Sequence, residues 1–509
     1  MNLNAARRLC PGFSRFDDML VASLTFMALM IARIRRLLGL TTWLWVSLLP
    51  AMAQSVPCSP QRPVRSMAEW EEVEYLLLTW TQYTPVLREI VRYARQECTV
   101  LIVCKEAAAV QADLRLHGIP LQGIEWLEHP FNSVWMRDYG PHSVYQTGVD
   151  SLVLVDWRYN RPRPLDDQLS QAIAQHLGLP LLRMDTPPHD LVHIGGNFLT
   201  DGNGLAFSSR LILQENGPQG HYNHSQRSSR TIDSLMRYDL GIRRYHKLAP
   251  LPYDPIDHLD MHMKLLDEQT LLVGQYPEGV ADGPQIEANL RYLRRVLPRD
   301  LRVLRVPMPA FHGRYPDQEA PYLTYTNAVF LNRSVLVPVY GLPSDSLALR
   351  IYRQALPGYR VVGIDCRPII VAGGALHCVT QTIGSRDPLR IMHRPLRDEP
   401  INGLPLKVEA TVAHRSGIAQ VRLWYRFGDK GPFREAPMIE RRDTCDQWVG
   451  YLPAVYAPTT VSYYLEATAR SGKRITRPMT APTGHWRFRL TPLRHQALLH
   501  AHSATPASW

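Results

Sequence analysis

The sequence has modest charge, few cysteines and no long uninterrupted hydrophobic run, and each shortage excludes a class of protein. Charged residues make up 20% of the 509 residues and hydrophobic residues 45%, which is typical of a folded globular protein rather than a disordered one. The net charge of +11 is concentrated in residues 1–53 and 401–509, so residues 54–400 are close to neutral. Because a nucleic-acid-binding protein would carry its basic excess on the main domain, we expect no nucleic-acid partner.

The longest apolar stretches lie near the N-terminus, where arginines interrupt them. Residues 19–32 and 37–49 are apolar, but three arginines stand between them, so they make a poor single span of about 20 residues. Basic residues followed by an apolar run and an Ala-Met-Ala sequence at 51–53 are typical of a secretory signal peptide. The sequence therefore predicts that residues 1–53 hold a signal peptide, that the protein is periplasmic or secreted, and that no membrane span remains after cleavage.

The seven cysteines do not predict a disulfide framework. Cys98 and Cys104 flank a predicted buried strand, and six residues of extended chain span about 20 Å, whereas a disulfide joins Cα atoms within about 7 Å. We therefore expect these two side chains to fill the core. Cys445 has no partner at the spacing of an immunoglobulin-like domain.

Strand-like and helix-like stretches alternate from residue 70 to about 390. A unit of two strands, a helix and another strand recurs about five times, which predicts α/β units arranged in a ring or a wound sheet. Residues 328–341 read as a hairpin around residues 332–334. Residues 401–490 alternate apolar and polar residues, which predicts a small β-sandwich that resembles an immunoglobulin-like domain. Residues 54–400 would form the main domain and 491–509 a tail.

Two motifs place polar residues at the ends of apolar stretches. In "NSVWMRDYGP" (132–141), Arg137 and Asp138 precede a Gly-Pro turn, and such a pair is either a local ion pair or part of a site. In "HIGGNFLTDGNG" (193–204), Gly196 and Asn197 either bring the backbone close to a ligand or serve hairpin geometry. Neither motif decides between its two interpretations by itself.

The motif "DHLDMHMKLLD" (257–267) places His258, Asp260 and His262 two residues apart. On a strand all three would face one side and could ligate a metal ion such as zinc. Alternatively, His258 is a general acid/base and Asp260 the counter-charge of a cationic substrate. No further set of metal ligands is obvious in the sequence, which favours the second interpretation.

The motif "VAGGALHC" ends at Cys378, which is a buried core residue, half of a disulfide or a nucleophile. A nucleophilic thiol needs an acid/base partner, and the motifs above offer His258, Asp138 and Asp260. Two carboxylates would oppose thiolate formation unless a planar cation such as a guanidinium lay between them, bound in bidentate fashion. Attack of the thiolate on the guanidinium carbon would release ammonia and leave a covalent thiouronium, which water would hydrolyse to a ureido product.

Six motifs in order carry a resemblance to a known family: "AEWEEVEYLLLTW", "WMRDYGP", "HIGGN", "HLD", "TYTNAVFLNRSVLVPVYG" and "GGALHC". Over about residues 66–390 the chain resembles the superfamily of agmatine deiminases and Porphyromonas-type peptidylarginine deiminases. The resemblance implies a five-bladed, pseudo-symmetric α/β propeller of ββαβ units, followed by an all-β immunoglobulin-like domain. It also implies no catalytic metal and no cofactor.

The resemblance assigns roles to individual residues. Cys378 would be the nucleophile, His258 the acid/base, Asp138 and Asp260 the guanidinium ligands, and Asn327 a residue that lines the site. An Arg-x-Arg loop like that of Arg161 and Arg163 is implied to hold the α-carboxylate of a C-terminal arginine. Trp135 would pack on the aliphatic stem of the substrate or in the core. Further substrate-binding candidates are Gly196 and Asn197.

These observations predict an exported arginine deiminase that acts on peptides or proteins with a C-terminal arginine and produces citrulline and ammonia. A first alternative is an agmatine or free-arginine deiminase, which in the agmatine case would serve putrescine biosynthesis. Ala372, where agmatine deiminases usually have a further glycine, speaks against agmatine, as does the lack of an acidic residue near Ser133. Further alternatives are a metallohydrolase built on residues 258–262 and a non-catalytic surface-binding protein.

Overall fold

The computed structural model describes residues 63–297, 301–311 and 322–492, which belong to one compact unit comprising residues 60–509. The predicted signal peptide in residues 1–53 and most of the predicted tail lie outside the described residues. Within the described part of the chain, no helix combines the length and the apolar character that a membrane crossing requires.

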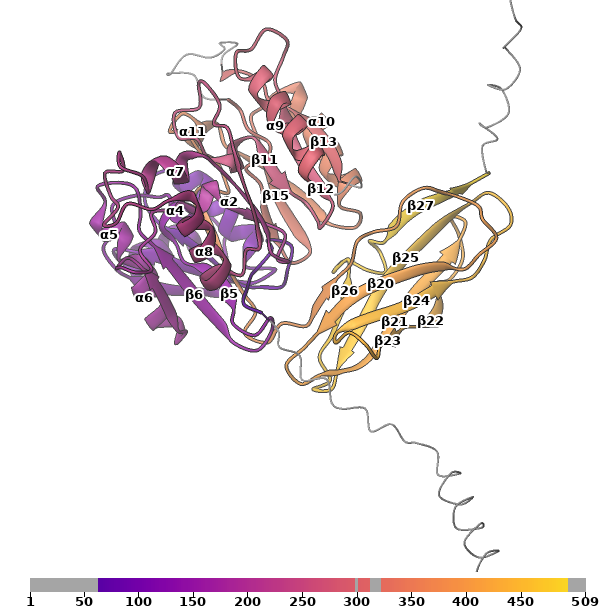
Figure 1. The fold of residues 1–509 in the computed structure, drawn as a ribbon. Coiled ribbons are helices and arrows are strands. Elements are labelled where there is room, and N and C mark those ends of the chain that lie inside the picture. The colour runs from indigo at the N-terminus through magenta and orange to yellow at the C-terminus, as the bar shows by residue number, and fades with distance from the viewer. Residues whose placement is uncertain (1–62, 298–300, 312–321, 493–509) are drawn as a thin grey trace, which may run out of the picture. The chain divides into compact units, whose positions relative to one another are not determined.

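Residues 65–384 form five separate small sheets joined by helices (Figure 1). The sheets have the strand orders β1-β5-β6-β7, β10-β9-β8, β11-β12-β13, β14-β15-β16 and β17-β2-β3-β4. Their strands are β1 (Arg65–Ser66), β2 (Val73–Thr79), β3 (Thr99–Cys104), β4 (Ile124–Glu128), β5 (His142–Tyr145), β6 (Leu152–Trp157), β7 (Leu181–Met184), β8 (Leu199–Thr200), β9 (Leu205–Ser209), β10 (Arg244–Leu248), β11 (Met263–Leu265), β12 (Thr270–Gln275), β13 (Arg302–Pro307), β14 (Val329–Leu331), β15 (Ser334–Val339), β16 (Arg360–Asp365) and β17 (Thr380–Gly384).

Helices connect strands within the sheets or, as α4 and α11 do, lead from one sheet to the next. They are α2 (Thr84–Ala94), α3 (Ala107–Leu116), α4 (Met136–Tyr139), α5 (Pro164–Asp167), α6 (Leu169–Leu177), α7 (Leu211–Glu215), α8 (Ser229–Leu240), α9 (Gly283–Val296), α10 (Pro343–Ala355) and α11 (Arg367–Ile370), with single 3-10 turns η1 (Gly195–Asn197) and η2 (Leu259–Met261). In α2, a proline opens the first turn and the apolar positions recur every three to four residues, which buries one face of the helix.

Four of the sheets contain the predicted succession of two antiparallel strands, a helical crossover and a parallel strand, and in the sheet of β2, β3 and β4 the antiparallel strand is supplied by β17 from the end of the region. In one example β14 pairs antiparallel with β15, and α10 then leads to β16, which lies parallel to β15. Helix α10 packs against β16 and β13 (Figure 1). Strand β17 is the last strand of this region and pairs with β2, which lies near the start of the region. The two ends of the region therefore meet in one sheet. The prediction that the five units form the blades of a propeller stays a prediction.

The C-terminal region is entirely β (Figure 1). Its two sheets have the orders β18-β20-β24-β23 and β19-β27-β25-β21-β22, with β26 paired to β25, and they share one hydrophobic core. Burial alternates along β20 as expected for a strand with one face in a core. The strands are β18 (Arg390–Met392), β19 (Glu399–Pro400), β20 (Leu406–Ala413), β21 (Ile418–Phe427), β22 (Arg434–Pro437), β23 (Ile439–Glu440), β24 (Gln447–Leu452), β25 (Thr459–Ala469), β26 (Arg474–Arg477) and β27 (Trp486–Thr491).

Four cysteines in the described part of the main region are free thiols, and the prediction that Cys98 and Cys104 form no disulfide with each other is confirmed. Cys104 is buried and Cys98 packs against the same core. Cys366 and Cys378 are also free and buried. Cys445, for which the sequence offered no partner at the expected spacing, is disulfide-bonded.

The predicted hairpin at residues 328–341 is confirmed, and its turn connects distant segments. Leu331 pairs with Ser334 across a two-residue turn, in which Asn332 adopts a left-handed conformation with φ 44°. The Asn332 side chain accepts a hydrogen bond from the backbone N–H of Val73 (2.9 Å) and donates to the carbonyls of Val73 (3.0 Å) and Glu97 (2.8 Å). One side chain thus joins the turn to the start of β2 and to the segment after α2.

We expect Asn332→Ala to lower the free energy of unfolding by about 2–4 kcal/mol. The substitution removes three hydrogen bonds, and alanine adopts the left-handed backbone conformation less readily than asparagine. Asn332→Gly should cost less, since glycine relieves the backbone term alone. Urea denaturation measures both, with the exposed neighbour Arg333→Ala as the control. Equal stability of the Ala variant and the wild type would contradict this account.

Candidate active site

Cys378 lies in the segment between α11 and β17. The side chain of Asn327 holds this segment in place by hydrogen bonds. The Asn327 side-chain oxygen accepts hydrogen bonds from the backbone N–H groups of His377 (2.9 Å) and Cys378 (3.3 Å). Its amide nitrogen lies 3.1 Å from Sγ of Cys378. Asn327 is fully buried and Cys378 is 2% exposed. The structure therefore places the predicted Asn327 directly at the sulfur, with an N–H donor aimed at it.

Three further predicted residues meet around Gly196. A β-carbon at Gly196 would lie 2.7 Å from Nδ1 of His258, 3.1 Å from Oδ1 of Asp138 and 3.3 Å from Oδ2 of Asp260. Nδ1 of His258 is 3.7 Å from Oδ1 of Asp138, and Sγ of Cys378 is 3.7 Å from Oδ2 of Asp260. Glycine is needed at position 196 because any side chain would occupy the space where these groups converge.

Several polar atoms of this cluster make no hydrogen bond within the described residues. They are Oδ1 of Asp138, Oδ1 of Asp260 and both ring nitrogens of His258, and all are buried. Buried polar atoms in folded proteins almost always have a partner. Two carboxylate oxygens that both lack a donor form a suitable acceptor set for a cation with several N–H groups.

The charges in the cluster oppose one another. Burial, followed by repulsion from Asp260, raises the pKa of Asp138 well above its ordinary value, although Arg161, Arg163 and Arg137 act in the opposite direction. Burial and the charges of Asp260 and Asp138 raise the pKa of the Cys378 thiol well above its usual range. Two adjacent carboxylates cannot both ionise easily without a cation. Both shifts favour the protonated forms of Asp138 and Cys378.

Asp260 and His258 titrate in the other direction. Burial would raise the pKa of Asp260, but the hydrogen bond and charge of His377, with smaller contributions from His258 and Arg137, lower this pKa below its ordinary value. Burial lowers the pKa of His258 to about 4, against the pull of Asp260. The site thus contains an ionised carboxylate at Asp260 and a neutral imidazole at His258, which can accept a proton.

Arg161 and Arg163 lie in the loop between β6 and α5, at the edge of this cluster. Both are half-buried, and the charges of both act on Asp138. Arg163 donates to the hydroxyl of Tyr159 (3.2 Å), and Arg161 donates to the carbonyl of Asn160 (3.5 Å). Among the residues that the structure describes, neither guanidinium forms an ion pair with a carboxylate, so both retain capacity for an anion.

The remaining predicted residues, Trp135 and Asn197, both contact the surrounding fold. A β-carbon at Gly374 would lie 2.6 Å from Cζ3 of Trp135 and 3.0 Å from Sγ of Cys378, so the indole lies beside the thiol. Trp135 also packs against two core clusters. The side-chain oxygen of Asn197 accepts a hydrogen bond from the backbone of Ser209 (2.8 Å), while its amide nitrogen is buried without a partner. Half of the Asn197 side chain is therefore engaged in fixing the fold.

His258, Asp260 and His262 do not lie on a strand, the condition under which all three would share one face. The middle of this motif is the 3-10 turn η2, because Asp257 adopts a left-handed φ of 57° and the chain turns before β11. The three side chains therefore do not alternate along one strand face. Within the described parts of the chain, no group of three or more histidine, cysteine or acidic side chains is placed to hold a metal ion.

The sequence did not reveal the hydrogen bonds of three other residues. Nδ1 of His377, the residue before the nucleophile candidate, lies 2.7 Å from Oδ2 of Asp260, and its Nε2 lies 3.0 Å from Oε1 of Glu69. Arg137 donates to the side chain of Gln381 and to the carbonyl of His377, so the local ion pair with Asp138 is not the contact that it makes. The "AEW" motif marks Glu69 but not its partner 308 residues away.

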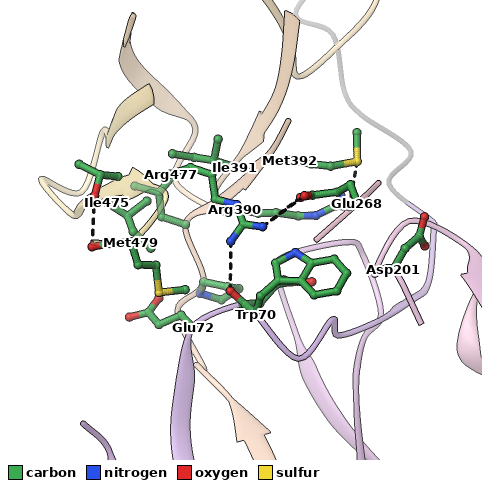
Figure 2. Close-up of a pocket in the computed structure, with 14 residues that line it drawn as sticks. Trp70, Glu72, Asp201, Glu268, Arg390, Ile391, Met392, Ile475, Arg477 and Met479 are labelled. Atoms are coloured by element: carbon green, nitrogen blue, oxygen red, sulfur yellow. Dashed lines mark hydrogen bonds and ion pairs between the residues drawn. The ribbon is translucent and has the colours of Figure 1, made fainter. Parts of the chain in front are cut away.

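A separate pocket lies away from this cluster and is shown in Figure 2. Its lining includes Trp70, Glu268 and Arg477 and none of the predicted site residues. Arg477 lies 3.2 Å from the Glu268 carboxylate and also donates to the carbonyl of Trp70 (3.3 Å). These two charges pair with each other, so the pocket does not present the free acceptors found around Gly196.

Comparison with known proteins identifies one family and several relatives that are named as deiminases. The model of the Porphyromonas-type peptidyl-arginine deiminase family matches residues 65–383. A Vibrio parahaemolyticus protein named "Putative agmatine deiminase" is 24% identical over 361 residues, which cover 62% of this chain and 95% of the relative. A Streptomyces coelicolor protein of the same name is 27% identical over 271 residues, covering 51% of this chain and 78% of the relative.

Solved structures share the fold of the main region. One titled "Putative Arginine Deiminase" from Porphyromonas gingivalis superposes with a TM-score of 0.56 at 23% identity, covering 64% of this chain and all of the other. The agmatine deiminase of Enterococcus faecalis superposes with a TM-score of 0.55 at 21% identity, covering 64% of this chain and 96% of the other. The likeness establishes a mixed α/β fold with an additional β-rich C-terminal region.

We expect a guanidinium ligand to release about one proton when it binds to the Cys378→Ala variant at neutral pH. A cation between the carboxylates lowers the raised pKa of Asp138, so the proton on that pair leaves. Calorimetric titration with agmatine in buffers of different ionisation enthalpy measures the released proton. A Cys378→Ala/Asp138→Asn variant should release none, and proton uptake by the single variant would contradict this description of the site.

Proposed function

Because the chain belongs to the Porphyromonas-type peptidyl-arginine deiminase family, we propose that it hydrolyses the guanidinium group of an arginine-derived substrate to a ureido group and ammonia, with Cys378 as the nucleophile. One observation carries this proposal. A neutral imidazole and the carboxylates of Asp138 and Asp260 converge at Gly196, and the thiol of Cys378 lies 3.7 Å from Oδ2 of Asp260. Each carboxylate keeps one buried oxygen without a donor among the described residues, and a guanidinium supplies N–H groups that such oxygens accept.

Binding of the cation activates the thiol. A guanidinium between Asp138 and Asp260 neutralises the two charges that raise the pKa of Cys378. His258, neutral at the start, takes the thiol proton, and the thiolate attacks the guanidinium carbon. His258 then returns the proton to the departing nitrogen, the C–N bond breaks, and ammonia leaves behind a thiouronium bonded to Cys378.

Hydrolysis reverses the role of the imidazole. A water molecule gives a proton to His258 and attacks the thiouronium carbon. The C–S bond breaks, the thiolate departs and is protonated again, and the ureido product is released. Asn327 donates toward Sγ at 3.1 Å, which supports the sulfur while it carries negative charge.

The substrate we propose is a peptide or protein with a C-terminal arginine. Arg161 and Arg163 bring two guanidinium groups without carboxylate partners, among the described residues, to the edge of the site. A C-terminal arginine carries an α-carboxylate that two arginines can bind. Prolines at positions 162 and 164 restrict the backbone around Arg163, which reduces the entropy that the loop loses on binding.

Agmatine is the second candidate substrate, because both relatives described above are named putative agmatine deiminases. Agmatine carries the same guanidinium but no carboxylate, so it would leave both arginines without an anion. The product from agmatine would enter putrescine synthesis, whereas the product from a peptide is a C-terminal citrulline.

We also propose that the protein is exported, through the signal peptide expected in residues 1–53. The disulfide at Cys445 supports this proposal, because disulfides persist in oxidising compartments. Cleavage of the secreted or periplasmic protein before Gln54 would be visible by N-terminal sequencing.

Replacement of Cys378 by Ala should lower citrulline and ammonia formation by about 10⁴-fold or more, since no other group in the site can form the covalent intermediate. Cys366→Ala provides the control, because Cys366 is also a buried free thiol but lies outside the cluster. Colorimetric citrulline assays with an arginine-terminated peptide and with agmatine measure the effect, in buffer with and without EDTA. Activity that survives in Cys378→Ala would refute the proposed function, and loss in EDTA would favour a metallohydrolase.

Arg161→Ala and Arg163→Ala should each lower kcat/KM for a peptide with a free C-terminal arginine by about 10-fold or more, mainly through KM. The same peptide ending in arginine amide is the matched control, because it keeps the guanidinium and loses only the carboxylate. The variants should therefore reduce the preference of the wild type for the free acid over the amide. An equal loss for the acid, the amide and agmatine would show that the two arginines do not bind the carboxylate.

A further inference from the structure

Four ionisable side chains form a continuous row from the interior to the candidate site. Nζ of Lys264 lies 2.6 Å from Oε2 of Glu69. The other oxygen of that carboxylate, Oε1, lies 3.0 Å from Nε2 of His377. Nδ1 of His377 lies 2.7 Å from Oδ2 of Asp260. The row Lys264–Glu69–His377–Asp260 thus ends on a carboxylate whose second oxygen, Oδ1, has no donor within the described residues.

The members of the row come from four separate segments. Lys264 lies on β11, Asp260 on η2, Glu69 just before β2 and His377 just before β17. The side chains of Lys264, His377 and Asp260 are at most 2% exposed, and that of Glu69 is 22% exposed. A row of this kind is therefore assembled only in the folded chain, and bulk water does little to screen it.

Hydrogen-bond chemistry fixes the protonation of His377. An ionised carboxylate only accepts hydrogen bonds, so a ring nitrogen bonded to one must donate. Asp260 and Glu69 are ionised: burial opposes their ionisation, but Lys264 and His377 lower the pKa of Glu69 well below its ordinary value, and His377 lowers that of Asp260. Both ring nitrogens of His377 face these carboxylates, at 2.7 Å from Oδ2 of Asp260 and 3.0 Å from Oε1 of Glu69, so each is placed to donate a hydrogen bond.

We propose that His377 is a positioning residue, held as an imidazolium between Glu69 and Asp260, which keeps Asp260 ionised and fixes its free oxygen toward the substrate guanidinium. The proposal deepens, and rests on, the proposed deiminase function. It assigns to the histidine beside the nucleophile an electrostatic task and no proton transfer with the substrate.

The other groups that face Asp260 do not replace this contact. His258 is uncharged at neutral pH, because burial lowers its pKa to about 4. Arg137 is cationic but donates to Gln381 and to the carbonyl of His377. Asp138 and Cys378 carry no positive charge in either protonation state, so they cannot take the place of His377. The imidazolium of His377 is therefore the cation in hydrogen-bond contact with Asp260 among the described residues.

The test compares Glu69→Gln with Glu71→Gln in the full chain. Glu71 lies two residues away and pairs with the buried Arg65 at 2.7 Å, so the control makes the same substitution in a similar ion pair that does not reach Asp260. We expect Glu69→Gln to lower kcat/KM for guanidino substrates by about 10-fold or more. Glu71→Gln should stay within about twofold of the wild type even where it lowers thermal stability.

The pH profile separates positioning from a purely structural role. In Glu69→Gln, Nε2 of His377 no longer faces a carboxylate, so the imidazolium loses the partner on its far side and the carboxylate pair of Asp260 and Asp138 loses a neighbouring cation. Loss of a cation raises the pKa of that pair, whichever member takes the proton. The acid limb of kcat and of kcat/KM should therefore move to higher pH by about one unit in Glu69→Gln and remain in place in Glu71→Gln.

Two further variants guard against misfolding. Glu69→Gln/Lys264→Met leaves no unpaired ammonium in the interior and should shift the acid limb in the same direction by a smaller amount. His377→Asn keeps a neutral donor near Asp260 and should shift the limb as Glu69→Gln does. If these folded variants retain the wild-type acid limb and kcat/KM, the proposal is wrong.

A spectroscopic measurement tests His377 without reference to activity. In the ¹H–¹⁵N spectrum of histidine side chains, the signals that disappear in His377→Asn should show two protonated ring nitrogens at pH 7 in the wild type. A single protonated nitrogen would overturn the proposal even if the deiminase activity is confirmed. If the wild type released no ammonia from any guanidino substrate, the proposed function would fail, whereas two protonated nitrogens would still support the imidazolium itself.

Discussion

The candidate site depends on the placement of two carboxylates and a thiol in one buried space. Oδ2 of Asp260 lies 3.7 Å from the sulfur of Cys378, and Asp138 and Asp260 both approach Gly196. Each ionised member of this group makes ionisation of the others harder. The hydrogen bond between Nδ1 of His377 and Oδ2 of Asp260 offsets part of this repulsion. Oδ1 of Asp138 and Oδ1 of Asp260 have no donor among the described residues. These two oxygens are therefore the ones that a cation can pair with.

The fold meets this constraint by bringing short irregular segments together at the edges of rigid sheets. Asp138 lies on the four-residue helix α4, Gly196 on η1 and Asp260 on η2, while Cys378 follows α11. Short turns of this kind can aim a side chain where a long helix or strand would bury it. The glycines then let the segments approach: at Gly196 and at Gly374, a β-carbon would enter the site itself. The sheets behind these segments carry the hydrophobic core that keeps the arrangement in place.

Sequence patterns predicted those parts of the molecule that local chemistry determines. The hairpin at Asn332 followed from turn residues between two apolar runs, and the order of the motifs brought Asp138, His258, Asp260 and Cys378 into one hypothesis. A strand through residues 258–262 could not be told from a tight turn, because a two-residue spacing of polar groups suits both. The bond from His377 to Glu69 spans 308 residues, and no periodicity or composition indicates a contact of that kind. The disulfide of Cys445 was missed for the same reason.

A buried thiol that keeps its proton at neutral pH is also protected from reagents other than its substrate. A neutral electrophile would meet Cys378 with Asp138 and Asp260 still opposing thiolate formation, so the reactive form would stay rare. A guanidinium both presents the electrophilic carbon and removes the repulsion, which makes recognition and activation a single event. In this scheme the row from Lys264 to Asp260 has a clear purpose: it keeps one carboxylate ionised in advance, so that the arriving cation needs to displace only the proton of the other. Specificity for a cationic substrate then follows from the charge balance of the site as much as from its shape.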